Sequence, residues 1–285
     1  MILPNSFLRD GFVSAETARK RRFLPGLQRP GILIGTEGET NTGKTEFILS
    51  CPGPGIVLAV DRMYDAVLDN PEPPVSRNDN FAFKEIKLSM ATMAEDHKAV
   101  WKSFYEDYIK ALANPDARTV GIDGDSDTWE VQRLAEFGKL TQIPSIMYVG
   151  VNAARRVMIA RAFDSGKIVV ATNKVKHEYV TVRDEEGNPK LSKDGKEVRE
   201  KSGDFVRQGF DDDNYLWHIQ LRHLRKDAYI NPKTGKEVKT QFGIRILKCK
   251  SNPGLKGEEL WGSDANFAGL VQLAYPNTEI GEWGL

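Results

Sequence analysis

The chain has few of the residues that mark a secreted, zinc-binding or membrane protein. Its 285 residues include only two cysteines, Cys51 and Cys249, and four histidines. Two scattered thiols favour a reducing cytoplasm over a disulfide framework, and the histidines share no metal-ligand spacing with them. The first residues lack a charged start followed by an apolar stretch, so we expect neither a signal peptide nor an anchor. No apolar run approaches the length of a membrane span, and no membrane partner is expected.

The chain also lacks an excess of charge of either sign. Lys and Arg together number 40, and so do Asp and Glu. Any contact with nucleic acid must therefore come from local patches rather than from a global field. The length suits one large α/β domain or two small ones, which can bury a core without disulfides or metals.

The strongest positive signal is a phosphate-loop sequence at 38–45. Its residues are Gly38, Glu39, Thr40, Asn41, Thr42, Gly43, Lys44 and Thr45, which fit Gly-x-x-x-x-Gly-Lys-[Ser/Thr] without a mismatch. An apolar run at 31–35 precedes it and a helix start at 46–49 follows it, which is the context such a loop requires. Lys44 would meet the terminal phosphates of a nucleotide, and the Thr45 hydroxyl would ligate Mg²⁺. The alternative is a glycine-rich turn that binds nothing.

Apolar runs and helical patterns alternate through the first part of the chain. Runs at 56–60, 119–123 and 168–173 predict buried parallel strands. Helices are expected at 93–113, from a cap at 125–127 to about 140, and at 152–164, with Gly166 ending the last one. This order predicts a parallel central sheet flanked by helices.

From Lys176 onward the pattern changes to strands and turns. Residues 183–203 are almost wholly polar and carry two turn signals, which predicts a polar hairpin insertion. Strands are expected at 216–221 and 242–247, with a hairpin turn at 230–235. We therefore expect an N-terminal arm at 1–28, a core at 29–275 with antiparallel strands in its C-terminal half, and a tail at 276–285. The basic cluster at 19–22 would contact DNA or a neighbouring subunit, or form a solvated helix face.

Two strand ends supply candidate partners for the phosphate loop. Asp123 directly follows an apolar strand, where a carboxylate would orient the magnesium shell; the alternative is a helix cap. Asn173 ends another strand and would sense the γ-phosphate, or would simply form a turn. Asp61 is the first candidate for positioning the attacking water, ahead of Glu130 and Glu39, although a turn residue is an equal alternative.

These pieces, in this order, resemble the RecA-like ATPases. More narrowly, they resemble phage-encoded P-loop ATPases associated with single-strand annealing and recombination. The resemblance covers about 30–275. Its most specific parts are the loop at 38–45, the stretch from Thr119 through Trp129 to Lys139, and the strand 168–173 with the residues up to Tyr179; a less specific part is 207–210.

The resemblance implies hydrolysis of ATP with Mg²⁺, assembly into a homo-oligomeric ring or filament, and binding of single-stranded DNA. A single-strand annealing or single-strand-binding protein is an implied partner, and the host cytoplasm an implied location. Lys248 and Lys250 resemble the late lysine pair that reaches the ATP of the adjacent subunit. Such a pair would neutralise charge building on the phosphates; the alternative is two solvent-facing lysines beside a buried cysteine on an edge strand.

The resemblance also places DNA contacts, and here the chain departs from the family. The first region would be about 138–156, and its candidate contacts are Lys139, Tyr148, Asn152, Arg155 and Arg156. Tyr148 would stack on a base or pack in a core or interface. The second region is the insertion at 183–203, whose mixed charges would bind phosphates weakly unless the hairpin segregates them. The family's glutamate near the second strand is replaced by Asp61-Arg62-Met63, which leaves the catalytic base open.

The sequence thus predicts a RecA-like ATPase of a phage recombination or replication system. One rival is another P-loop enzyme, a kinase or a packaging motor, although no lid, acceptor pocket or nuclease domain is evident. The other rival is a nucleotide-binding scaffold with little hydrolysis that recruits an annealing protein or another recombination factor.

Overall fold

The computed structural model describes residues 31–60, 64–70, 73, 75–88, 94–138, 143–210, 213–230, 232–233 and 235–285. The expected N-terminal arm, its basic cluster, Asp61 and Lys139 lie outside these residues.

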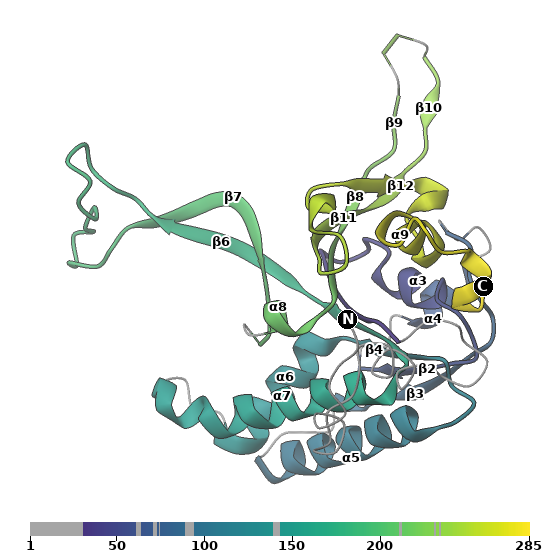
Figure 1. The fold of residues 1–285 in the computed structure, drawn as a ribbon. Coiled ribbons are helices and arrows are strands. Elements are labelled where there is room, and N and C mark those ends of the chain that lie inside the picture. The colour runs from purple at the N-terminus through teal and green to yellow at the C-terminus, as the bar shows by residue number, and fades with distance from the viewer. Residues whose placement is uncertain are drawn as a thin grey trace, which may run out of the picture.

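The core of the fold is one eight-stranded, mostly parallel sheet (Figure 1). Its order is β12-β11-β8-β1-β5-β4-β2-β3. The strands are β1 (Leu33–Glu37), β2 (Gly55–Ala59), β3 (Phe81–Glu85), β4 (Thr119–Asp123), β5 (Ile168–Asn173), β8 (Ile219–Lys226), β11 (Gln241–Cys249) and β12 (Glu259–Trp261). The six strands from β8 to β3 run parallel, whereas β11 and β12 are antiparallel to their neighbours. The expected parallel sheet and late antiparallel strands are therefore confirmed.

Helices cover the sheet from both sides. They are α3 (Lys44–Leu49), α4 (Tyr64–Leu68), α5 (Ala94–Ala113), α6 (Asp125–Phe137), α7 (Tyr148–Ser165), α8 (Asp213–Leu216) and α9 (Phe267–Ala274), with short 3-10 turns η2 (Ser145–Met147), η3 (Pro253–Leu255), η4 (Gly262–Asp264) and η5 (Ile280–Trp283). In Figure 1, α3 and α9 lie on one side of the sheet and α5, α6 and α7 on the other.

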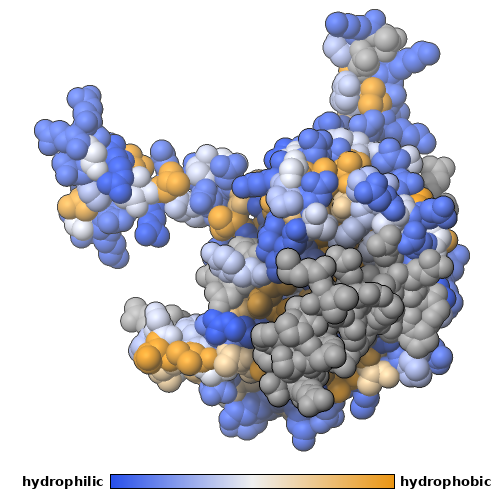
Figure 2. All heavy atoms as spheres, in the orientation of Figure 1, coloured by the Kyte–Doolittle hydropathy of each residue, from blue (hydrophilic) through white to orange (hydrophobic). Residues whose placement is uncertain are grey.

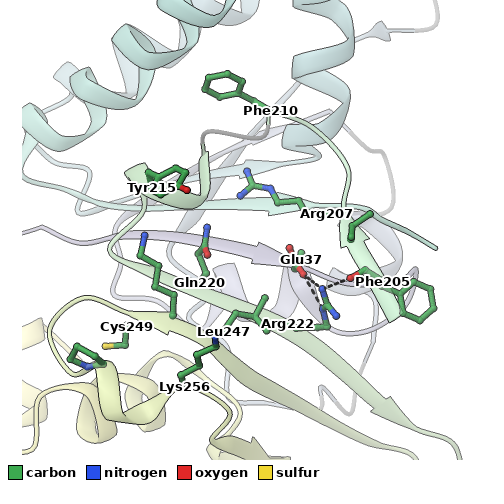
Figure 3. Close-up of a pocket in the computed structure, with 13 residues that line it drawn as sticks. Glu37, Phe205, Arg207, Phe210, Tyr215, Gln220, Arg222, Leu247, Cys249 and Lys256 are labelled. Atoms are coloured by element: carbon green, nitrogen blue, oxygen red, sulfur yellow. Dashed lines mark hydrogen bonds and ion pairs between the residues drawn. The ribbon is translucent and has the colours of Figure 1, made fainter. Parts of the chain in front are cut away.

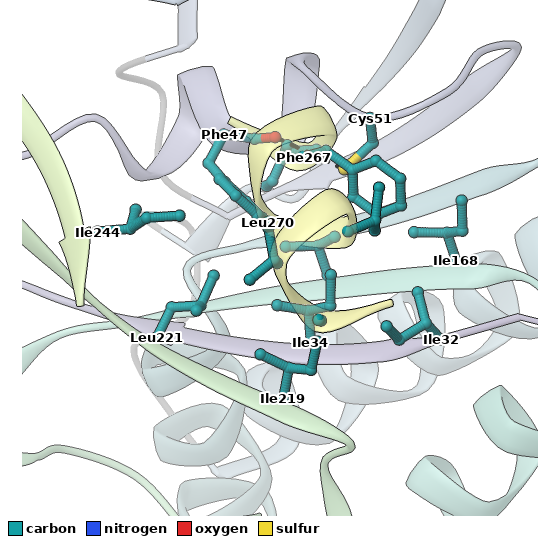
Figure 4. Packing of buried hydrophobic residues seen from close by; sticks show 14 of the residues in the cluster. Ile32, Ile34, Phe47, Cys51, Ile168, Ile219, Leu221, Ile244, Phe267 and Leu270 are labelled. Carbon is teal, nitrogen blue, oxygen red and sulfur yellow. Dashed lines mark hydrogen bonds between the residues drawn. The ribbon is translucent and has the colours of Figure 1, made fainter. Parts of the chain in front are cut away.

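Two apolar clusters follow from the alternation of side chains along the strands. On the α3–α9 side, Ile34 and Ile219 pack with Phe47 of α3 and with Phe267 and Leu270 of α9 (Figure 4). On the opposite side, the neighbouring strand residues pack against α5 and α7. Strands buried on both faces explain the continuous apolar runs of the sequence.

Helix α5 and the end of α7 agree with their sequence patterns. Trp101, Phe104, Tyr108 and Leu112 all belong to the second cluster or pack against it. Gly166 follows α7 with φ 69°, the left-handed conformation expected of a terminating glycine. These segments are long and periodic, so the helices predicted from their sequence agree with those in the structure.

The two-stranded arms project from the core (Figure 1). One arm pairs β6 (Val175–Thr181) with β7 (Arg199–Arg207), and bridges continue the pairing to Arg183–Pro189 and Leu191–Glu197. The other pairs β9 (Tyr229–Ile230) with β10 (Glu237–Val238). The predicted polar hairpin is confirmed. It is longer than expected, because its strands extend from residue 175 to residue 207 rather than from 183 to 203.

Several elements differ from the sequence expectation. Strands β3 and β12 and helix α9 carry no signal that the sequence analysis used. The strand expected at 216–221 begins only at Ile219, because 213–216 form α8. The segment expected as a C-terminal tail contains Trp283, which is buried and packs edge-on against Phe267 at 5.9 Å between ring centroids.

Candidate functional site

The phosphate-loop segment follows β1 at the carboxyl edge of the parallel strands. Strands β1, β5 and β4 lie side by side, so Glu37 is level with Asn173, and Asp123 ends the next strand along. In open α/β sheets this edge is where ligands bind. A cavity of about 210 Å³ opens there. The residues that line it are the whole segment 38–45, Glu46, Asp123, Gly124, Thr172, Asn173, Lys174, Val175 and Gln208.

The loop has a conformation that needs its glycines. Gly43 adopts φ 88°, and a Cβ on Gly38 would lie 2.7 Å from the Thr42 hydroxyl oxygen and 3.0 Å from Cβ of His223. Thr42 Oγ1 donates to the Glu39 carbonyl at 2.8 Å, and the Gly38 N–H donates to the Asn173 carbonyl at 3.2 Å. The loop is therefore held in a fixed shape by its own side chains and by β5.

The Lys44 ammonium lies over the loop. Its Nζ donates to the Gly38 carbonyl at 3.0 Å and to the Glu39 carbonyl at 2.5 Å. Both acceptors are neutral, so an anion entering the cavity would be a stronger partner for this cation. The geometry suits a phosphate site.

Thr45 and Asp123, the predicted magnesium pair, are in contact. Thr45 Oγ1 donates to Asp123 Oδ2 at 2.8 Å, and Thr172 Oγ1 donates to the other carboxylate oxygen, also at 2.8 Å. Thr172 in turn accepts from the Gly124 N–H at 2.9 Å. The adjacent hydroxyl and carboxylate are hard oxygen donors of the kind Mg²⁺ uses in phosphate sites, where waters and phosphates complete the shell. The residues present thus fit the ion.

Asn173 is the last residue of β5 and takes part in a polar network centred on Ser126. Its Oδ1 accepts from Ser126 Oγ at 3.3 Å, and Ser126 Oγ also donates to the Gln208 carbonyl at 2.6 Å. The Lys174 N–H donates to the same hydroxyl oxygen at 2.9 Å. Lys174 and Gln208 are the residues at which the long arm starts and ends. One serine therefore joins α6 to both strands of the arm, beside the cavity.

His223, which no local sequence pattern marks, lies behind the loop on β8. The residue is 5 % exposed and its ring meets that of Phe47 edge-on at 5.6 Å between centroids. Among the described residues, none forms a hydrogen bond with its Nε2. Burial, together with the charge of Lys44, lowers the pKa of His223 from 6.5 to about 3, although a hydrogen bond with the Thr42 backbone opposes this. A neutral imidazole therefore packs under the loop and adds no cation beside Lys44.

The other candidate bases differ in their surroundings. Glu130 is on the exposed side of α6, paired with Arg133, and does not line the cavity. Glu39 is exposed at the cavity mouth. Glu46, which the sequence analysis did not propose, lines the cavity, and burial raises its pKa, with the nearby Asp123 charge adding to the effect. Asp61 lies outside the described residues.

Lys248 and Lys250 lie away from this cavity. They are at the end of β11, where the strand pairs with β8, and neither lines the phosphate-loop cavity of the same chain. Lys248 is half-buried, and burial and the neighbouring Lys250 lower its pKa. Cys249 between them is buried, as in the alternative of two solvent-facing lysines, but β11 is not an edge strand because β12 pairs with its outer side. Within one chain, the lysine pair and the phosphate loop are not brought together.

The expectation that residues 138–156 contact DNA is wrong for Arg155. Arg155 cannot face DNA, because its side chain is 1 % exposed and forms a buried ion pair with Asp125. Tyr148 packs against Phe137 and Trp129, and Arg156 lies over the Phe210 ring at 5.9 Å. Asn152 is half-buried on α7.

The exposed surface at the start of α7 is apolar rather than basic. Ile146, Met147 and Val149 are all at least half exposed, and Figure 2 shows apolar side chains gathered at this end of the helical layer. These three side chains offer no phosphate contacts.

A search of protein-family models and a search of curated proteins find no match to the chain. In the part of the chain that the structure describes, no helix is long and apolar enough to cross a bilayer. The same residues contain no cluster of three or more His, Cys, Asp or Glu side chains that could hold a metal ion.

Proposed function

We propose that the protein is a RecA-like P-loop ATPase that binds ATP with Mg²⁺ at residues 38–45. The observation that carries this proposal is the contact between Thr45 and Asp123 at the carboxyl edge of the sheet. The two residues are 78 positions apart and lie on elements separated by β5, yet they meet beside Lys44. A glycine-rich turn without a ligand would not require this meeting.

The strand order supports the same proposal. Strand β5 lies between the strand that precedes the loop and the strand that ends in Asp123, with β8 on the outer side of β1. This order is compatible with a RecA-like core. It places Asn173 between the loop and Asp123, where an amide would contact the terminal phosphate.

The residues would share the work of phosphoanhydride hydrolysis. Backbone N–H groups of the loop and the start of α3 would hold the phosphates, and Lys44 would stabilise charge on the transferred group. Bound Mg²⁺ would supply neutralisation of the phosphate oxygens. Thr45 and Asp123 would hold that ion, and Asp123 would keep its orientation through Thr172. Asp61 remains our proposed group for positioning the attacking water, and Glu46, which lines the cavity, is the alternative.

We further propose that the protein acts as a homo-oligomer on single-stranded DNA, in recombination or replication of a phage. Since Lys248 and Lys250 lie away from the cavity of their own chain, they would act on the ATP of an adjacent subunit. Hydrolysis would then depend on assembly.

The test is ATP turnover with and without single-stranded DNA over a range of protein concentrations, with Lys44→Ala as the blank. Turnover that DNA stimulates, and that rises more than proportionally with protein, is the expected result. Lys250→Ala should then abolish turnover and leave ATP binding intact. Turnover that ignores DNA and is linear in protein would contradict the assembly mechanism. Tight ATP binding without turnover would favour a nucleotide-binding scaffold that recruits an annealing protein.

A further inference from the structure

The helical layer leaves part of one sheet face uncovered. Helices α5 and α7 pack on β1, β2, β4 and β5, and the apolar cluster beneath them includes no described residue of β8 or β11. Because side chains alternate along a strand, Gln220 and Arg222 of β8 point to this same uncovered side, away from Ile219 and Leu221. Lys248 is level with Gln220 in the register of β11.

A cavity of about 760 Å³ occupies this place, with the base of the long arm as its opposite wall (Figure 3). Its volume is in the range of small-molecule sites. The residues that line it are Glu37, Phe205, Val206, Arg207, Phe210, Tyr215, Gln220, Arg222, Leu247, Lys248, Cys249, Pro253 and Lys256. They come from β1, β7, α8, β8, β11 and the segment around η3, so the fold builds the cavity from distant parts of the chain.

The charge of the described lining is positive. It contains four cationic side chains, those of Arg207, Arg222, Lys248 and Lys256, and one carboxylate, Glu37. Glu37 is already paired, because Arg222 Nε donates to its Oε1 at 2.9 Å. Three positive charges therefore remain in excess, which favours an anionic ligand carrying more than one charge.

The cavity also has aromatic surface beside the cations. Tyr215 is 79 % exposed on α8, and Phe205 and Phe210 line the same space. Figure 3 shows the Arg207 side chain reaching from β7 toward Tyr215, with the amide of Gln220 close by. Cations next to an exposed ring are the combination that binds phosphates and stacks bases without reading sequence.

We infer that this cavity binds nucleotide units of a single nucleic-acid strand, with phosphates against Lys256 and Arg207 and a base against Tyr215. This inference rests on the proposed function and specifies where the strand binds. It replaces the two contact regions expected from the sequence, residues 138–156 and the charge-balanced end of the arm. A strand is favoured over a free nucleotide because the cations come from separate elements along an open sheet face, whereas the phosphate loop gathers its N–H groups at one point.

The cavity adjoins the phosphate loop through one residue pair. Glu37 immediately precedes Gly38, and Arg222 holds both the Glu37 carboxylate and, at 2.8 Å, the Phe205 carbonyl of the arm. Gln208, next to Arg207, lines the phosphate-loop cavity itself. A strand bound here would therefore contact Arg207, the neighbour in sequence of an arm residue that borders the phosphate loop.

The experiment is fluorescence anisotropy of a labelled oligo-dT strand over a series of salt concentrations. Lys256→Ala should lower the slope of log affinity against log salt by about 0.7, the value for one phosphate contact on a single strand. Tyr215→Ala should weaken binding about five- to a hundredfold and leave that slope unchanged. Lys98→Ala, at an exposed position of α5, and Tyr229→Ala, at an exposed position of β9, are matched controls for which no effect is expected. Unchanged melting temperatures would show that all four variants fold.

Two results would overturn the inference. One is strand binding that both cavity variants leave unaltered. The other is that ATP fully displaces the strand when the strand is bound to the Lys44→Ala protein. That result would assign the cavity to a mononucleotide. Binding is measured without hydrolysis, so the two proposals fail separately: a protein with no ATP turnover but Tyr215-dependent strand binding would lose only the ATPase proposal.

Discussion

Asp123 has both carboxylate oxygens engaged, by Thr45 on one side and Thr172 on the other. A carboxylate fixed in this way is suited to holding an ion in place and is not available as the base that activates water. In the proposed ATPase, Asp123 would therefore orient the ion, Lys44 would supply positive charge, and another group would position the water.

Substitutions at Thr45 separate the hydroxyl from the shape of the side chain. Thr45→Val keeps the branched shape and removes the oxygen, so affinity for ATP in the presence of Mg²⁺ should fall at least about tenfold. Thr45→Ser keeps the oxygen and should stay close to the wild type. Titration calorimetry with and without Mg²⁺ measures this. Equal losses in the two variants would show that packing, not the hydroxyl, matters.

His223 predicts a pH dependence of stability. Its pKa of about 3 in the folded protein is below its value of 6.5 when unfolded, so only the unfolded state takes up the proton as pH falls between these values. The free energy of unfolding should therefore decrease on acidification, by up to about 1.4 kcal/mol per pH unit from this group.

The test is chemical denaturation at about pH 7 and about pH 5, in the range where this linkage acts. His223→Gln should shrink the difference between the two free energies, because glutamine does not titrate. The exposed His177→Gln is the matched control. An unchanged difference in His223→Gln would contradict the account of the buried neutral imidazole.

At the scale of single residues, the site residues that could be predicted are those in a continuous motif or at the end of a strand. The loop, Asp123 and Asn173 could be predicted because each follows an apolar strand. Thr172, Ser126, Arg222 and His223 could not, because their partners lie 47 to 185 residues away and no local spacing marks them.

Among the secondary-structure elements, α6 and α7 are joined by a buried ion pair. Arg155 of α7 donates to Asp125, the first residue of α6, and Thr128 accepts from Arg155 at 3.2 Å. Because Asp125 is two residues from Asp123, α7 helps to hold the end of β4.

Breaking this pair should be costly, whereas replacing it should not. Arg155→Met leaves the Asp125 charge buried and should lower the free energy of unfolding by about 3–5 kcal/mol. The double variant Asp125→Asn, Arg155→Met should recover much of that loss. Denaturant unfolding of the two single variants and the double variant measures the coupling. Additive effects of the two substitutions would rule out a mutual interaction.

Long elements with a regular apolar pattern were predictable from the sequence, and short elements were not. Helix α5 shows one apolar face over 20 residues, whereas β3 is five residues long with alternating partial exposure and β12 has only three residues. Helix α9 buries Phe267, Leu270, Val271 and Ala274, which follow helical spacing, but at eight residues it is too short for this spacing to stand out in the sequence.

At the scale of the whole molecule, the described residues form a packed core and two projecting arms, and the arms are largely hydrophilic in Figure 2. The end of the long arm, 183–203, carries six basic and six acidic residues. Its strands pair only with each other among the described strands. The arm end thus adds little to the core and has no net charge for binding phosphates.

Removal of the arm end should leave the core intact. Thr181 pairs with Arg199, so Asn-Gly in place of 182–198 would close the hairpin with a two-residue turn. The melting temperature should change by less than about 2 °C, since surface changes of this kind cost little, and the salt slope of strand binding should not fall. Differential scanning calorimetry and anisotropy report the two results. A large loss of either would give the arm end a role in folding or in phosphate contacts.

The measurement that tests the central claim most directly is equilibrium binding of ATP by titration calorimetry, with and without Mg²⁺, to the wild type and to Lys44→Ala. The account predicts one site per chain in the wild type, tighter with Mg²⁺, and at least about tenfold weaker in Lys44→Ala. Absence of binding, or equal binding by both proteins, would contradict the assignment of residues 38–45 as a phosphate site.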